Sequence, residues 1–263
     1  MNGAGKTTTI RILLDLVRPS SGRAAIFGDD CQARSLAARA RVGYLPGEPG
    51  FYGDMTGEST LDLLGRIGGT RVDPARRRAL LDRLEFHAGD LRRRMREYST
   101  GMKRKLGIVS AFQSDPSLLI LDEPTEGLDP LMQEAFYDLV VDARRRGRTI
   151  FMSSHVLPEV ERVCDRIGLL RGGELVLLAT VPEVRALAGR RVIVRFTADV
   201  APPRLPPGCE LLEARPRLWD LRVRGPLGPI TGLLAPLPVD DLDVQLPHLE
   251  EILRTYYASE TRA

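Results

Sequence analysis

The chain has 263 residues, of which 43% are hydrophobic and 28% are charged, and its formal net charge is +3. This composition is ordinary for a globular protein of one or two domains, and so small a charge does not favour nucleic-acid binding. The cysteines Cys31, Cys164 and Cys209 are too far apart in sequence for a metal site and indicate thiols in a reducing compartment. No apolar run is long enough to span a bilayer, so we expect a cytosolic protein that reaches a membrane only through a partner.

The first eight residues form a glycine-rich segment that ends in a lysine and two threonines. They read MNGAGKTT and match most of the phosphate-binding pattern G-x-x-x-x-G-K-[ST]. Glycines let successive backbone N–H groups surround phosphate oxygens, and the N-terminus of a helix expected over 9–17 adds partial positive charge. In this pattern Lys6 reaches the β- and γ-phosphates, and the Thr7 hydroxyl binds Mg²⁺. The alternative is a glycine-rich helix cap without a ligand.

The first glycine of this pattern, and the strand that precedes it in such folds, have no counterpart in a sequence that starts at Met1. Each buried aliphatic side chain of a central strand contributes roughly 1.5–3 kcal/mol, whereas a whole domain has a net stability of about 5–15 kcal/mol. We therefore expect the natural protein to start further upstream. Mass spectrometry of the native protein would contradict this expectation if its N-terminal peptide started at Met1.

The following hundred residues alternate short strands and helices. Thr56 is a predicted N-cap, and Pro74 is expected to open a helix. The arginine runs 76–78 and 92–94 are interpreted as solvated helix faces, because no aromatic residues interleave them, and no nucleic-acid partner is expected. The expected elements are strands over 23–27 and 42–45 and helices over 35–41, 57–67, 75–86 and 104–112.

The residues 118–130, LLILDEPTEGLDP, are the stretch around which the chain is organised. The unbroken apolar run 118–121 predicts a strand buried on both faces, as in a parallel sheet. Asp122 and Glu123 follow at the end of this strand, where α/β folds bind ligands. Two neighbouring acids at this position favour a divalent metal and an activated water, with solvated loop acids as the alternative.

Two further polar segments lie near this stretch in the predicted fold. Ser99 and Gly101 precede the helix expected over 104–112, and could offer a hydroxyl and N–H groups to an anion or simply cap the helix. A strand expected over 149–152 is followed by His155. By itself, a lone histidine after a strand is more often structural.

In this order and spacing, the motifs resemble those of the ATP-binding subunit of an ABC transporter. The similarity covers residues 1 to about 180. The matching segments are Walker A without its first glycine (1–8), a divergent signature (99–103), Walker B with its following glutamate (118–123), the D-loop (127–130) and the switch histidine (153–155).

The resemblance implies an ATPase that converts ATP and water to ADP and phosphate, with ATP and Mg²⁺ as cofactors. Glu123 is the implied general base, His155 the implied γ-phosphate sensor, and Thr7 and Asp122 the implied metal ligands. The residues implied to bind the nucleotide are Asn2, Gly3, Ala4, Gly5, Lys6, Thr7, Thr8, Ser99, Gly101 and Asp129.

The resemblance also implies partners and a location. Two such subunits enclose two ATP molecules, so that Ser99 and Gly101 of one subunit complete the site formed by Lys6 and Asp122 of the other, and we expect a homodimer. An integral membrane permease would hold the dimer at the inner face of the cell membrane, on the cytoplasmic side. The string LPGEPGFY, followed by MTGES, resembles bacterial exporter-type subunits. The expected function is to drive export of an unknown substrate, with a non-transport or catalytically impaired ABC ATPase as the alternative.

One position departs from the family pattern. After the strand over 42–45 the family has a glutamine that helps position Mg²⁺ and water, whereas this chain has Gly47 and then Glu48. Glycine has no side chain for this task. Glu48 is shifted by one residue and is retained only as a candidate substitute, which leaves the catalytic competence of the site open.

The predicted fold class is α/β, a P-loop NTPase with a mostly parallel sheet and a helical subdomain, plus a small C-terminal α+β domain. The expected domains are 1–180, with the helical subdomain at about 48–113, and 190–263. The second domain is interpreted as a packing or dimerisation module with Trp219 in its core. Its expected strands cover 191–197, 210–214, 218–223 and 239–246, and its helices cover 228–234 and 249–257; a strand over 174–179 and a helix from Pro182 precede it.

Overall fold

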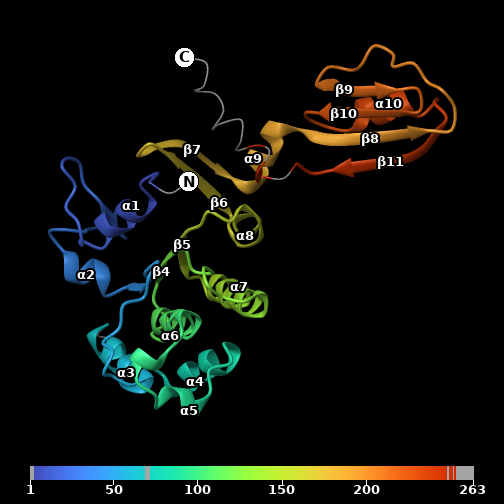
Figure 1. The fold of residues 1–263 in the computed structure, drawn as a ribbon. Helices are drawn as coiled ribbons and strands as arrows, with labels where there is room; N and C mark the ends of the chain where they lie inside the picture. The colour runs from blue at the N-terminus through green and yellow to red at the C-terminus, as the bar shows by residue number, and fades with distance from the viewer. Residues whose placement is uncertain (1–2, 69–71, 248, 251, 253–263) are drawn as a thin grey trace. The chain divides into compact units, whose positions relative to one another are not determined.

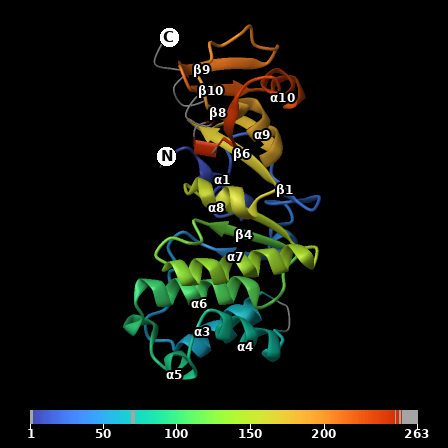
Figure 2. The same cartoon turned by 90° about the vertical axis from the view of Figure 1, so that its right-hand side faces the viewer.

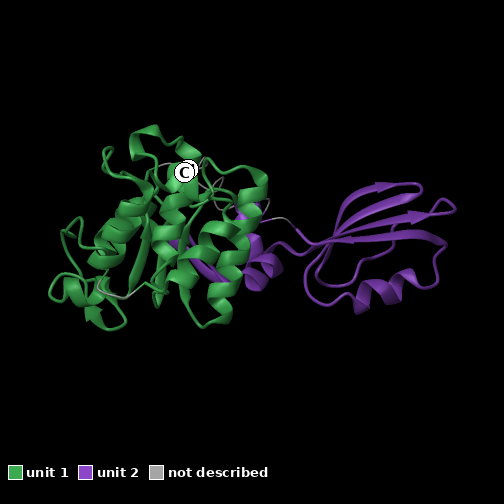
Figure 3. Cartoon of the chain, turned by 90° about the horizontal axis from the view of Figure 1, so that it is seen from below, with its two compact units in different colours: residues 1–156, 170–174 green, residues 157–169, 175–263 purple. Residues whose placement is uncertain are grey.

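The structure is a computed structural model that describes residues 3–68, 72–247, 249–250 and 252. The chain divides into two compact units (Figure 3). The first comprises Met1–Val156 with Leu170–Glu174, and the second Leu157–Leu169 with Leu175–Ala263. Each unit has its own core of buried apolar side chains.

A three-stranded parallel sheet lies at the centre of the first unit (Figure 1). Its order is β3 (Val42–Leu45), β4 (Leu118–Asp122) and β5 (Thr149–Ser153). All five residues of β4 are buried, which confirms the doubly buried strand predicted from its apolar run. Because the strands are parallel, their carboxyl ends meet at one edge, where Asp122 is in register with Ser153.

Helices pack against this sheet from both sides. Leu118 and Ile120 of β4 form a core with Ile10 of α1 (Lys6–Leu13), Ala38 of α2 (Ser35–Arg39) and the buried thiol of Cys31. On the other side α6 (Thr100–Phe112) packs against β3 and α7 (Pro130–Arg145) against β5. Figures 1 and 2 show α6 and α7 side by side, and the rings of Phe112 and Phe136 join them edge to face at 6.5 Å. A short hairpin, β1 (Ala25–Ile26) and β2 (Asp29–Asp30), follows α1.

The connection from β3 to β4 is a helical subdomain. Thr56 caps α3 as predicted, through a reciprocal pair of hydrogen bonds with Ser59, and Asp73 caps α4 with Pro74 in the first turn. Such caps satisfy N–H groups that a helix leaves unpaired at its start. The elements are α3 (Gly57–Ile67), α4 (Pro74–Arg83), α5 (Ala88–Leu91) and the 3₁₀ turn η1 (Met95–Glu97), followed by α6.

The second unit contains a four-stranded antiparallel sheet in the order β11-β8-β10-β9. Trp219 is fully buried on its inner face, contacts Phe196 edge to face at 4.6 Å, and donates its indole N–H to the carbonyl of Val200. Its predicted place in the core is confirmed. Leu170–Glu174, which holds the end of β6 and the first residue of β7, belongs to the first unit. Apart from that segment, the elements of the second unit are α8 (Leu157–Val163), β6 (Arg166–Arg171), β7 (Glu174–Thr180), α9 (Val181–Ala188), β8 (Arg190–Phe196), β9 (Cys209–Arg215), β10 (Leu218–Val223), α10 (Gly228–Leu234) and β11 (Val239–Gln245).

Several predicted bounds were wrong, for local reasons. The first helix starts at Lys6 rather than residue 9, because Gly5 adopts the left-handed conformation and serves as its N-cap. It ends at Leu13 because Asp15 takes a φ of 55°. The strand expected over 23–27 is only Ala25–Ile26, and α7, α8 and β6 were not predicted. Most of the expected helix 249–257 lies outside the described residues.

Replacing Gly43 with alanine should destabilise the first unit. A Cβ at this position of β3 would lie 2.2 Å from the carbonyl oxygen of Ala111 and 2.7 Å from Pro116 Cγ, so α6 would have to move away from the sheet. Overpacking of this kind costs about 1–3 kcal/mol, measurable by urea unfolding. Gly89→Ala is the matched control, because nothing lies within 4 Å of its added Cβ; an equal loss in both variants would contradict the packing explanation.

Candidate active site

The loop before α1 is shaped to receive an anion. Gly3 and Gly5 have φ values of 85° and 103°, a conformation that glycine adopts without steric cost. The N–H of Gly173 donates to the carbonyl of Ala4 at 3.1 Å and fixes the loop from the other side. No acidic residue occupies the first turn of α1, so the positive end of the helix dipole is not neutralised there. The predicted ligand Asn2 lies outside the described residues.

Lys6, Glu123 and His155 form one hydrogen-bonded network. Lys6 Nζ donates to Glu123 Oε1 at 2.9 Å, and the second carboxylate oxygen lies 2.7 Å from His155 Nδ1 and 3.1 Å from the His155 backbone nitrogen. An ionised carboxylate only accepts hydrogen bonds, so Nδ1 of His155 carries the hydrogen. The structure thus brings together three of the residues predicted for this site, from α1, the loop after β4 and the loop after β5.

Glu123 combines a strained backbone with a stabilised charge. Its φ of 47° is unusual for a residue with a Cβ, and such strain concentrates at active sites. Its N–H lies 3.2 Å from both the carbonyl and the hydroxyl oxygen of Ser153. Burial alone would raise the pKa of the carboxyl, but the hydrogen bonds and charges of Lys6 and His155 outweigh burial and lower it. Glu123 is therefore ionised at neutral pH, as a general base must be.

Asp122 is nearly fully buried at the carboxyl end of β4 and accepts a hydrogen bond from the Ser153 hydroxyl. A Cβ built on Gly47 would lie 3.6 Å from Asp122 Oδ2, so the loop after β3 runs directly past this carboxylate. Thr7, in the first turn of α1, adds a hydroxyl next to Lys6.

This donor set fits Mg²⁺. Carboxylate and hydroxyl oxygens are hard ligands of the kind that Mg²⁺ prefers, and proteins commonly hold this ion with one or two side chains together with phosphate oxygens and water. Within the described part of the chain, no group of three or more His, Cys, Asp or Glu side chains could hold a metal. Asp122 and Thr7 supply oxygens of this kind and would bind Mg²⁺ together with a phosphate ligand.

The predicted residues Ser99, Gly101 and Asp129 lie outside the network around Lys6 in the described structure. Ser99 and Asp129 are N-caps: their side chains accept from the N–H of Met102 at 3.2 Å and of Met132 at 3.0 Å. Gly101 lies against the loop after β4, where its added Cβ would be 3.4 Å from the Gly127 carbonyl oxygen. The helix-cap interpretation thus describes what Ser99 does within one chain.

Sequence reasoning missed two residues that shape the site. The Ser153 hydroxyl donates a hydrogen bond to the Asp122 carboxylate and accepts one from the backbone N–H of Glu123. These contacts depend on the register of β4 and β5, which the sequence alone does not give. Arg104 is buried, and its guanidinium contacts the carbonyls of two loops beside Asp122. A signal for Arg104 was available, because it falls four and eight residues before Ile108 and Phe112, on the buried row of α6.

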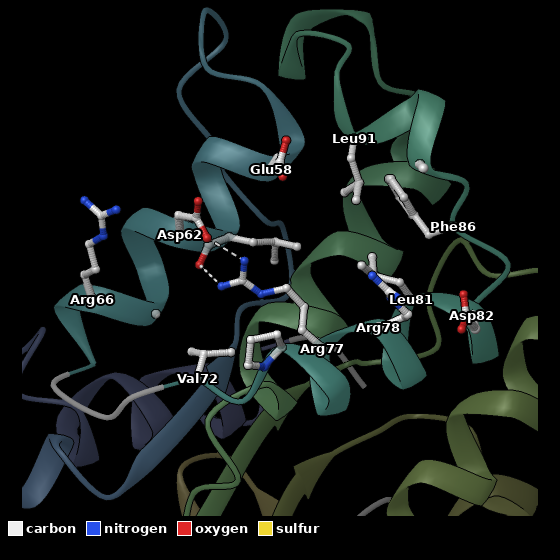
Figure 4. Close-up of a pocket in the computed structure, with 14 residues that line it drawn as sticks. Glu58, Asp62, Arg66, Val72, Arg77, Arg78, Leu81, Asp82, Phe86 and Leu91 are labelled. Atoms are coloured by element: carbon white, nitrogen blue, oxygen red, sulfur yellow. Dashed lines mark hydrogen bonds and ion pairs between the residues drawn. The ribbon is translucent and has the colours of Figure 1, made fainter.

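A pocket of about 660 Å³ lies elsewhere, in the helical subdomain (Figure 4). The guanidinium of Arg77 reaches across it to Asp62 at 2.5 Å. None of the predicted site residues that the structure describes lines this pocket, and residues 3–6 of the glycine-rich loop are absent from its walls, so it is not the anion site. The residues around it are Glu58, Leu61, Asp62, Gly65, Arg66, Val72, Pro74, Arg77, Arg78, Leu81, Asp82, Phe86, Ala88 and Leu91.

Comparison with known proteins identifies the family to which the chain belongs. The family model described as "ABC transporter" matches residues 1–126. The daunorubicin resistance ATP-binding protein DrrA3 of Streptomyces coeruleorubidus is 31% identical over 263 residues, covering 95% of this chain and 83% of the relative. A solved ATP-binding subunit of an ABC transporter superposes with a TM-score of 0.66 at 32% identity, covering 71% of this chain and 78% of the other. The chain belongs to the family of ABC transporter ATP-binding proteins.

Other members of the ABC family agree over shorter lengths. The bacitracin transport ATP-binding protein BcrA of Bacillus licheniformis is 39% identical over 66% of this chain and 56% of its own length. Uncharacterized ABC transporter ATP-binding proteins of a Nostoc and a Synechocystis strain are 39% and 37% identical, and this chain spans only 55% and 52% of their lengths. The predicted α/β P-loop NTPase fold is confirmed. None of the described helices is long and apolar enough to cross a membrane.

Proposed function

We propose that this chain binds and hydrolyses ATP with Mg²⁺ and supplies the energy for export through a separate membrane permease. The observation that carries the proposal is the network of Lys6, Glu123 and His155 beside the buried Asp122. Nothing in a helix cap or a solvated acidic loop requires a lysine, a strained glutamate and a histidine to meet at the end of a buried strand.

In the proposed reaction the N–H groups of the glycine-rich loop and Lys6 bind the β- and γ-phosphates, while Thr7 and Asp122 hold Mg²⁺. Mg²⁺ held by these residues would supply positive charge to the phosphate oxygens. Glu123 accepts the proton of a water that attacks the γ-phosphorus, the bond to the bridging oxygen breaks, and ADP leaves. For this to happen Lys6 must exchange its ion pair with Glu123 for the phosphate, which frees the carboxylate for the water.

His155 would report the presence of the γ-phosphate. A doubly protonated imidazole donates from both ring nitrogens. It can therefore keep Glu123 in place through Nδ1, where the 2.7 Å contact already exists, while Nε2 contacts the phosphate.

The proposed assembly is a homodimer on the cytoplasmic face of the membrane, bound to the permease. Ser99 is the N-cap of α6 and Gly101 lies in its first turn, at a helix N-terminus able to meet the phosphates of a nucleotide held by a second subunit. Two relatives carry the words "bacitracin transport" and "daunorubicin resistance" in their names, which supports export.

We further propose domains at 1–180, with a helical subdomain at about 48–113, and at 190–263, the last as a packing or dimerisation module.

A catalytically impaired ABC protein is the second candidate, and Gly47 favours it. The family's glutamine would be placed against Asp122 by this loop, yet the chain offers no side chain there. Loss of one group that supports the metal or the water lowers the rate of hydrolysis, typically by about 10- to 100-fold. This candidate therefore predicts ATP binding with slow or no phosphate release.

The test is ATP binding and phosphate release by the chain with and without Mg²⁺, compared with Lys6→Ala. We expect the wild-type protein to bind a fluorescent ATP analogue and to release phosphate only with Mg²⁺, and Lys6→Ala to bind at least about tenfold more weakly, since hydrogen bonds to charged groups are worth about 1.5–3 kcal/mol. Circular dichroism would establish that both samples are folded. A folded wild-type chain that binds no nucleotide would refute the proposal, and binding without turnover would select the impaired candidate.

A further inference from the structure

Arg104 is the only arginine of α6 and is buried, with 3% of its surface exposed. Its guanidinium contacts the backbone of two loops at once. Nε donates to the Glu126 carbonyl at 3.1 Å, Nη1 donates to the Pro46 carbonyl at 3.0 Å, and Nη2 donates to the Gly47 carbonyl. The carboxylate of Glu126 lies 3.9 Å from Nη2. A single side chain therefore joins the loop after β3 to the loop after β4.

These two loops border the metal side of the proposed site. Gly47 runs past the Asp122 carboxylate, and Glu126 follows Glu123 by three residues. Burying a guanidinium is costly unless its donors are satisfied, and here backbone carbonyls satisfy them. Burial lowers the pKa of Arg104, whereas the charges of nearby acids, Glu126 first, favour the cation.

The position of Arg104 on α6 adds a second connection. Ser99 and Gly101, the residues proposed to meet the nucleotide of the other subunit, lie in the preceding turn of the same helix. Gly101 already lies against Gly127 of the loop that Arg104 binds. Arg104 and these residues belong to the same hydrogen-bonded helix start, so the contacts of Arg104 link the position of the two loops to that of Ser99 and Gly101.

We propose that Arg104 is a positioning residue: it holds the loops at Pro46–Gly47 and Glu126 around Asp122, and so fixes the start of α6 relative to the metal side of the site. This inference rests on the proposed ATPase function. Gly47 has no side chain that could contact a metal bound at Asp122. The position of the loop after β3 therefore depends on contacts to its backbone, which Arg104 supplies. In a dimer the same side chain would couple the metal side of one site to the Ser99–Gly101 turn that completes the other.

The experiment compares Arg104→Ala and Arg104→Lys in the full chain with Arg77→Ala as control. Arg77 also joins separate elements, through Asp62, Gln113 and the Leu61 carbonyl, and none of these partners belongs to the two loops that Arg104 binds. Lysine keeps the charge and fills the space, yet one ammonium cannot reproduce three donors spread over two loops. Both Arg104 variants should lose about 10- to 100-fold in kcat, as loss of a residue supporting metal ligands does, with ATP binding and KM nearly unchanged.

Chemical rescue separates positioning from simple loss of stability. Millimolar guanidinium should restore much of the kcat of Arg104→Ala, because the ion can occupy the vacated site, whereas equal sodium chloride should not. Unchanged kcat in both Arg104 variants, with wild-type turnover intact, would overturn this inference alone. The inference is also overturned if Arg77→Ala, relative to its decrease in Tm, loses as much kcat as the Arg104 variants do. It is likewise overturned if guanidinium restores none of the kcat of Arg104→Ala. A folded wild-type chain without turnover would remove the proposed function and this inference together.

Discussion

Glu123→Gln should lower ATP turnover by roughly 10²–10³-fold, the usual cost of removing one group that acts in the transition state, and should leave ATP binding almost unchanged. The amide has the shape of the carboxylate and can still accept from Lys6, but it cannot take the proton of the attacking water. The half-buried environment and the strained φ of 47° belong to the position and are retained. The expected result is a chain that binds ATP and does not consume it.

Phosphate release under saturating ATP, together with titration of a fluorescent ATP analogue, measures the two effects separately. Glu58→Gln is the matched control: it makes the same chemical change on the exposed first turn of α3 and should leave turnover unchanged. If homodimers close around ATP, the Glu123→Gln protein should also accumulate as an ATP-dependent dimer in size-exclusion chromatography. Turnover equal to wild type in Glu123→Gln would reject Glu123 as the base.

Asp122→Asn should be at least as damaging, because it removes the carboxylate proposed to bind Mg²⁺. A bound metal contributes several kcal/mol to transition-state stabilisation, and each 1.36 kcal/mol is about tenfold in rate, so we expect a loss of about 10²-fold or more. The amide keeps the volume of the side chain in its buried position at the end of β4. The defect should appear as a higher Mg²⁺ requirement and as a lower maximal rate.

Ser153→Ala provides an internal comparison for the metal site. It removes the hydroxyl that donates to Asp122 and lies 3.2 Å from the Glu123 backbone nitrogen, but it leaves both acids in place. Supporting groups of this kind typically contribute 10- to 100-fold, so its rate should fall between wild type and Asp122→Asn. Titration of phosphate release with Mg²⁺ ranks the three proteins. A rate for Asp122→Asn above that of Ser153→Ala would contradict the assignment of Asp122 as metal ligand.

Local patterns predicted those elements whose sequence period is unambiguous. The helix over 57–67, the strand over 218–223 and the helix over 228–234 agree with the structure at both ends. The unbroken apolar run of β4 predicted a buried parallel strand, because only helices on both faces can cover such a run. By contrast α7 was missed, although Asp129 and Pro130 form a typical helix start, because these residues were read only as a ligand motif.

For the site, sequence predicted the residue types but not their partners. Lys6 and Glu123 are 117 positions apart, and their ion pair depends on the packing of α1 against β4. The contacts of Arg104 likewise join segments up to 58 positions apart. Motif spacing identifies residues that act on one ligand, whereas a supporting residue such as Ser153 or Arg104 is defined only by three-dimensional contacts. Charged side chains are mostly exposed, so a single sequence gives little indication of the few that are buried.

The buried thiol of Cys31 gives the chain a built-in chemical probe of local opening. It packs with Ile10 of α1 and Leu118 of β4, and burial raises the pKa of the thiol, which slows its reaction with alkylating reagents. Labelling at Cys31 therefore requires local opening of the core that α1, α2 and β4 form around it, while Cys164 and Cys209 are partly exposed and mark the background rate. Because α1 begins at the glycine-rich loop, binding of a nucleotide to that loop should slow the alkylation of Cys31. Mass spectrometry of the labelled protein would measure this change.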